Sequence, residues 1–141
     1  MSTLVVDASI AFSWTVETPH SPKCVHILRS TEALVAPDLI VPELTNAFTL
    51  QIRNGTADPQ RIKDGLEFLP RWFMDLVPSH SLRIKALDLA LALNHPAYDC
   101  FYLALAIDRG ARFVTLDGEF LAKARGGGYG ESVVHLEEWG A

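Results

Sequence analysis

The sequence predicts an α/β domain with a central, mostly parallel sheet of four or five short strands. Short apolar runs rich in β-branched residues alternate with longer segments whose apolar residues recur at helical spacing. This alternation is typical of parallel strands joined by helical crossovers. No repeat or linker interrupts it, so we expect one domain over residues 1–141, long enough to bury roughly two thirds of its unfolded surface.

The first strand is the apolar run Leu4-Val5-Val6, which leads directly to Asp7. A short run with two β-branched residues indicates a strand covered on both faces. Asp7 therefore stands where the strand stops being covered, at the edge where open α/β sheets carry their ligand sites. Ser9 is expected to cap a short helix that ends near Val16.

A second strand-and-helix unit follows. A helix begins at Ser21, a strand covers 33–36, and a long helix runs over 39–53 to a closing Asn-Gly pair. Glu43 lies in the first turn of this long helix. Asn46 lies three residues later and therefore on the same helical face.

The rest of the chain continues the alternation. The segment 98–107 is apolar nearly all round, as expected of a helix in the middle of the domain, and the glycine-rich segment 126–130 is expected to be a mobile loop. The other expected elements are helices over 59–70 and 81–93, a strand over 72–77, a strand over 112–115, a helix from Asp117 to about 124, and a strand over 132–135.

Four acidic residues stand at strand ends or helix starts: Asp7, Glu43, Asp99 and Asp117. In a parallel sheet these positions share one edge, so the four carboxylates can converge despite their separation in sequence. Each alone could be a helix cap, worth on the order of 0.5–2 kcal/mol. Asp7 and Asp99, however, are flanked by apolar residues, and a buried carboxylate without a partner is costly.

A hard divalent cation would remove the repulsion among these acids. Mg²⁺ and Mn²⁺ prefer oxygen ligands and keep several waters, and they can activate water for attack on a phosphodiester. Ser9 and Thr115 each lie two residues from a proposed ligand and could orient a carboxylate or a water, or simply act as caps.

The charge balance leaves a nucleic-acid partner open. The net charge is −5, but setting four of the 17 acidic residues aside as a metal site leaves 13 against 12 basic ones. Cys24 and Cys100 are expected to be buried thiols without a zinc or disulfide pattern. No apolar run reaches the roughly 18 residues of a membrane span, and the start lacks the pattern of a secretory signal, so we expect a soluble, cytoplasmic protein without membrane association.

These motifs, in this order, resemble PIN-domain proteins, most closely the VapC-type toxins of type II toxin–antitoxin systems. The matching segments are Val5-Val6-Asp7-Ala8-Ser9, Ala36-Pro37-Asp38 with Glu43-Leu44-Thr45-Asn46-Ala47, His95-Pro96-Ala97-Tyr98-Asp99 running into Cys100–Ala106, and Phe113-Val114-Thr115-Leu116-Asp117. The resemblance implies a three-layer α/β/α sandwich and a Mg²⁺- or Mn²⁺-dependent endoribonuclease that leaves 5′-phosphate and 3′-hydroxyl ends.

The same resemblance assigns roles to individual residues. The metal ligands and catalytic acids fall on Asp7, Glu43, Asp99 and Asp117. The supporting polar residues fall on Ser9, Asn46 and Thr115, and the further acid found in many relatives has Glu119 as its nearest candidate.

Partners also follow from the resemblance. It implies an RNA substrate, a homodimer, and a VapB-type antitoxin whose C-terminal segment lies over the carboxylates, within a larger toxin–antitoxin assembly. Phe12, Trp14 and Phe48 are candidates for an exposed apolar cleft that receives it, and equally for the core. Basic residues that could steer RNA are Arg53, Arg61, Lys63 and Arg71.

Other functions remain open at this point. A phospho-acceptor signalling domain would need paired acids after the first strand and a late lysine, and a haloacid-dehalogenase-type phosphatase would need an acid where Ser9 stands. A housekeeping PIN nuclease in RNA processing and a PIN scaffold that only binds are not separated from the toxin by sequence.

Overall fold

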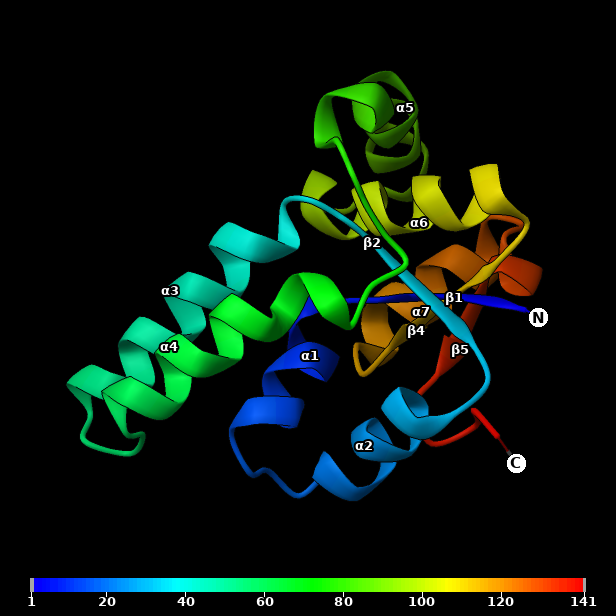
Figure 1. The fold of residues 1–141 in the computed structure, drawn as a ribbon. Coiled ribbons are helices and arrows are strands. Elements are labelled where there is room, and N and C mark those ends of the chain that lie inside the picture. Colours follow the sequence, from blue (N-terminus) through cyan, green and yellow to red (C-terminus); the bar gives the residue numbers. More distant parts are fainter. Residues whose placement is uncertain (1, 141) are drawn as a thin grey trace.

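The structure, a computed structural model that describes residues 2–140, is a five-stranded sheet in which every pair of neighbouring strands is parallel (Figure 1). The strand order is β3-β2-β1-β4-β5. This confirms the α/β class and the parallel sheet. The strands are β1 (Thr3–Val6), β2 (Ala33–Pro37), β3 (Asp75–Val77), β4 (Arg112–Thr115) and β5 (Val133–His135).

Helices make the connections between successive strands and cover both faces of the sheet. Within the described residues there are seven α-helices, with short 3₁₀ turns at Leu69–Arg71, Ser79–Leu82 and Gly130–Ser132. The α-helices are α1 (Ala8–Thr15), α2 (Ser21–Arg29), α3 (Ile40–Arg53), α4 (Pro59–Phe68), α5 (Arg83–Leu93), α6 (Ala97–Arg109) and α7 (Gly118–Gly126).

The direction of the connections reverses in the middle of the sheet. From β1 the chain moves outward through β2 to β3, and it then returns past β1 to add β4 and β5 on the other side. Because such crossovers are right-handed, α1–α4 lie on one face and α5–α7 on the other. Figure 1 shows α5 and α6 above the sheet and α1 and α2 below it. The reversal makes β1 and β4 neighbours, with Val6 paired to Val114, and ligand sites form at such switch points.

The core lies on both sides of the central strands. Helix α6 packs between the sheet and α5, which explains why its sequence is apolar nearly all round. Three fully buried aromatic rings continue from α6 through β4 to α7: Tyr102 stacks on Phe113 at 5.3 Å, and Phe113 meets Phe120 edge-on at 5.9 Å.

Most boundaries shift by one or two residues, and three differences have a clear physical reason. Helix α1 is capped by Asp7, not by Ser9, because the Asp7 carboxylate accepts the Ile10 N–H as the chain leaves β1. The strand expected over 72–77 is reduced to 75–77, since Trp72 turns out of the extended path to pack edge-on against Trp14 at 5.2 Å. The glycine-rich segment 126–130 is shorter as a loop than expected, because α7 extends to 126 and a 3₁₀ turn begins at 130.

Two other expectations were tested directly. Cys24 and Cys100 are free and buried, as predicted. None of the helices within residues 2–140 combines the length and the apolarity that crossing a membrane requires.

Candidate metal centre

The four acids expected at the edge of the sheet each follow a strand or open a helix. Asp7 leaves β1 and caps α1, while Asp117 leaves β4 and caps α7. Glu43 and Asp99 lie in the first turns of α3 and α6. All four therefore stand near helix N-termini, where the partial positive charge of the backbone N–H groups stabilises a carboxylate.

The structure brings Asp99 and Asp117 together, and it adds a residue that the sequence reasoning did not select. Ligand atoms of His95, Asp99 and Asp117 lie within 4.8 Å of one another. Among the described residues, Asp7 and Glu43 are not part of this close group. Asp7 is nevertheless near enough to Glu43 and Asp99 for their negative charges to raise its pKa.

Asp7 is the most strongly perturbed of the four acids. The pKa of Asp7 is raised from 3.8 to about 6, mainly by burial and in smaller part by the negative charges of Asp99 and Glu43. Hydrogen bonds from Ser9 Oγ at 2.6 Å and the Ile10 N–H at 3.1 Å oppose it. Ionising the Asp7 carboxylate therefore costs free energy in the folded protein, and a nearby cation would offset that cost.

Glu43 is linked to the core through one buried phenol. Tyr102, which is 1% exposed, donates from Oη to Glu43 Oε1 at 2.6 Å. Burial raises the pKa of Glu43, the hydrogen bond from Tyr102 opposes this shift, and the charge of Asp99 supports it. Burial also raises the pKa of Tyr102 far above its ordinary value, so the phenol remains protonated and able to donate.

The four carboxylates share one arrangement: in each, one oxygen accepts hydrogen bonds and the other accepts none from the described residues. The free oxygens are Oδ2 of Asp7, Oε2 of Glu43, Oδ1 of Asp99 and Oδ2 of Asp117. The engaged oxygens are Asp7 Oδ1, Glu43 Oε1, Asp99 Oδ2 and Asp117 Oδ1. Asp99 Oδ2 lies 2.8 Å from His95 Nε2. Asp117 Oδ1 accepts from the backbone N–H groups of Glu119 and Phe120 at 3.0 and 3.1 Å. Each acid is thus fixed through one oxygen and offers the other.

The comparison with known proteins decides the family. The PIN domain model matches residues 4–126 of this chain. The chain belongs to the PIN-domain family. It is 30% identical over 122 residues to the ribonuclease VapC3 of Pyrobaculum aerophilum, covering 85% of this chain and 93% of the relative. The crystal structure of PAE2754 from Pyrobaculum aerophilum matches with a TM-score of 0.66 and 25% identity, over 96% of this chain and 85% of that one.

Of the supporting residues predicted for this PIN domain, only Ser9 donates a hydrogen bond from its side chain to one of the four carboxylates. Ser9 donates to Asp7, whereas Thr115 Oγ1 accepts the backbone N–H of Asp117 at 3.0 Å and so fixes the turn rather than the carboxylate. Asn46 is exposed on α3. The side chain of Glu119 is 75% exposed and lies 3.5 Å from Lys123.

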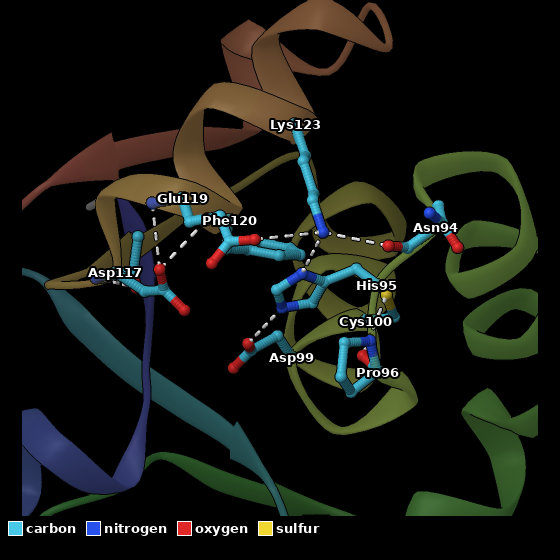
Figure 2. Close-up of polar contacts among 10 residues, drawn as sticks. Asn94, His95, Pro96, Asp99, Cys100, Asp117, Glu119, Phe120 and Lys123 are labelled. Atoms are coloured by element: carbon cyan, nitrogen blue, oxygen red, sulfur yellow. Dashed lines mark hydrogen bonds and ion pairs between the residues drawn. The ribbon is translucent and has the colours of Figure 1, made fainter.

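The sequence reasoning did not select His95, Lys123 or Tyr102 as functional residues. Figure 2 shows Lys123 reaching from α7 to the His95 ring, which in turn meets Asp99. A signal was available for Tyr102, which lies three residues after Asp99 and therefore beside it on α6. His95 lies in the turn before α6, so helical spacing does not predict its contact with Asp99. The contact with Lys123, 28 residues away, has no such signature.

An apolar groove of about 440 Å³ lies beside this edge, between α1 and α3. Its lining includes Ser9, Phe12, Ala47 and Leu50. Of the two alternatives for the aromatic residues, cleft or core, the structure decides for the core at Phe48, which is 2% exposed and stacks on Phe12 at 5.4 Å. Phe12 and Trp14 are partly buried against the core.

Proposed function

We propose that this PIN domain is a metal-dependent endoribonuclease whose ion is held by Asp7, Glu43, Asp99 and Asp117. The observation that carries the proposal is the shared arrangement of these acids, each fixed through one oxygen with the other left open. A second support is the raised pKa of Asp7, which reflects negative charge and burial without a paired cation. Helix capping does not explain the arrangement at Glu43, whose engaged oxygen accepts from the Tyr102 phenol and not from a backbone N–H.

The donor set fits Mg²⁺ or Mn²⁺. Four carboxylate oxygens form a hard ligand set of the kind that Mg²⁺ and Mn²⁺ prefer, and each of the four acids would give the ion one oxygen. Asp99 and Asp117 are the two acids that come nearest to each other, with ligand atoms within 4.8 Å. Asp7 and Glu43 would complete the set that holds the ion.

The bound ion supplies activation of water and neutralisation of charge on a scissile phosphodiester. The residues of the chain provide the fixed frame for that chemistry. Ser9 and the Ile10 N–H orient Asp7, Tyr102 orients Glu43, and the first turn of α7 orients Asp117. Because these donors are already in place, little reorganisation accompanies ion binding.

The choice of RNA and the toxin role rest on similarity. The relative that matches most of this chain is named a ribonuclease VapC, so we infer a VapC-type toxin with RNA as substrate and 5′-phosphate and 3′-hydroxyl products. The inferred partner is a VapB-type antitoxin, and the apolar groove beside Ser9 is the surface that suits its C-terminal segment. A cytoplasmic homodimer within a toxin–antitoxin assembly completes the proposal.

RNA cleavage by the purified chain tests the enzymatic claim. Without antitoxin, the wild-type protein should cut total cellular RNA with Mg²⁺ or Mn²⁺ and stop with EDTA. Asp7→Asn and Asp99→Asn should each lower the rate at least ~100-fold while remaining folded. Asp88→Asn, at an exposed site on α5, is the matched control and should cut normally. A folded wild-type protein that cleaves no RNA would leave a scaffold that only binds.

Expression in cells separates the toxin from a housekeeping nuclease. Induction without a partner should arrest growth, and Asp99→Asn should relieve the arrest. Co-expression of a small protein encoded beside this gene should also relieve it. If growth continues although the purified protein cuts RNA, the nuclease stands and the toxin role fails.

A further inference from the structure

His95 is engaged at both ring nitrogens. Its Nε2 lies 2.8 Å from Asp99 Oδ2, and its Nδ1 lies 3.3 Å from Lys123 Nζ (Figure 2). The side chain is only 7% exposed, and the ring packs at 4.8 Å on Phe120. The imidazole is therefore fixed in place by two polar contacts and one aromatic contact.

These contacts decide where the imidazole proton lies. A lysine ammonium group only donates hydrogen bonds, so the Nδ1 atom that faces Lys123 must accept. In a neutral ring the proton is then on Nε2, and it is donated to Asp99. The other contacts of Lys123 agree with a donor, since Nζ lies 2.9 Å from the Asn94 carbonyl oxygen and 3.5 Å from a Glu119 carboxylate oxygen.

The same contacts exclude His95 as a ligand in this arrangement. One of its nitrogens lies among the atoms that approach within 4.8 Å at the centre, but a metal ligand needs a free lone pair. The only lone pair of this ring points to Lys123. His95 therefore acts on Asp99, not on an ion.

We propose that Lys123 and His95 form a positioning pair that holds Oδ2 of Asp99 and thereby presents Oδ1 as the one oxygen open to the ion. Lys123 selects the tautomer, His95 donates, and the Asp99 carboxylate cannot rotate to offer both oxygens. This inference rests on the proposed metal site, and it adds two residues that touch neither ion nor RNA. Groups that orient a ligand in this way typically contribute 10–100-fold in metal affinity.

The first test needs no variant. The ¹⁵N and ¹H shifts of His95 in the metal-free wild-type protein should place the ring proton on Nε2. A proton on Nδ1, or a doubly protonated ring, would overturn the tautomer and with it the proposal.

The second test measures Mn²⁺ affinity by electron paramagnetic resonance. His95→Ala should weaken binding 10–100-fold, and His95→Gln should restore most of it because the Gln amide can donate to Asp99. For Lys123→Met, the direction of the change in Mn²⁺ affinity distinguishes two roles of the lysine. If Lys123 acted only through its charge, removing a cation beside the site would tighten Mn²⁺ binding, whereas loss of positioning weakens it.

Lys85→Met is the matched control, because it removes a lysine paired with Asp108 on the α5–α6 surface. It should leave the Mn²⁺ dissociation constant unchanged. Mn²⁺ binding by His95→Ala within twofold of wild type, or tighter binding by Lys123→Met, would overturn the positioning role while leaving the metal site intact. A wild-type protein that binds no Mn²⁺ would overturn both.

Discussion

Replacing Asp7 with Asn should make the metal-free protein more stable near neutral pH. The carboxylate is disfavoured in the folded state because burial and the charges of Glu43 and Asp99 raise its pKa. Asn keeps an oxygen at the position that accepts from Ser9 and the Ile10 N–H, so the cap of α1 is retained. The substitution therefore removes a charge and leaves the local structure.

The size of this stability difference follows from the pKa shift of Asp7. The pKa of Asp7 rises from 3.8 to about 6, and each unit corresponds to ~1.4 kcal/mol of free energy between the protonation states. Because the folded pKa is the higher one, the folded state binds the proton more tightly. Stability is therefore lost as pH rises from about 4 to about 7, and the full penalty of ~3 kcal/mol applies above that range.

Urea denaturation in EDTA measures this directly. The free energy of unfolding of Asp7→Asn should exceed that of the wild type by ~3 kcal/mol at pH 7.5 and by only ~1 kcal/mol at pH 4.5. Using the difference between the two proteins cancels the titration of groups they share. Saturating Mg²⁺ should reverse the order at pH 7.5, because an ion that binds only the folded wild type stabilises it.

Two results would refute this reasoning. One is a difference that stays constant between pH 4.5 and pH 7.5, which would mean that Asp7 titrates alike in the folded and unfolded states. The other is a variant less stable than the wild type at pH 7.5 in EDTA, which would show that the carboxylate stabilises the fold without an ion.

The remaining predictions concern stability measured by denaturation. Tyr102→Phe should cost ~1–3 kcal/mol at pH 7.5, because Glu43 loses its buried donor, and an unchanged stability would show that water replaces the phenol. Phe113→Ala should cost ~3–5 kcal/mol, since the side chain is fully buried between two aromatic rings, and a loss below ~1.5 kcal/mol would contradict that packing. Gly110→Ala should cost ~1 kcal/mol through its φ of +60° alone, because no atom crowds the new methyl group, whereas Gly118→Ala, without a positive φ, should be neutral or stabilising.

Much of the fold was accessible from sequence because its signals are local. The apolar run before Asp7 and the all-round apolar segment 98–107 correspond to β1 and α6, since burial on both faces leaves no polar stripe. The exact ends of helices were harder to predict from the sequence. Asp7 and Ser9 are both good caps two residues apart, and only the path of the chain out of β1 selects Asp7.

The candidate site also has a part that was predictable from the sequence and a part that was not. The positions of Asp7, Glu43, Asp99 and Asp117 follow from the rule that strand ends in a parallel sheet share one edge. Their hydrogen bonds do not follow from it. Tyr102 reaches Glu43 across 59 residues, and that contact exists only because α6 packs beside the start of α3.

The sequence by itself determined the α/β class, the order of the elements and the four acids at the edge of the sheet, because periodicity and capping are short-range properties of the chain. The tertiary structure alone decided the strand order, which makes β1 and β4 neighbours, and the pairing of Glu43 with Tyr102. It also brought Lys123 to His95, since the approach of α7 to the start of α6 depends on the whole sheet. Contacts between residues far apart in the sequence are set by packing, and no local pattern encodes them.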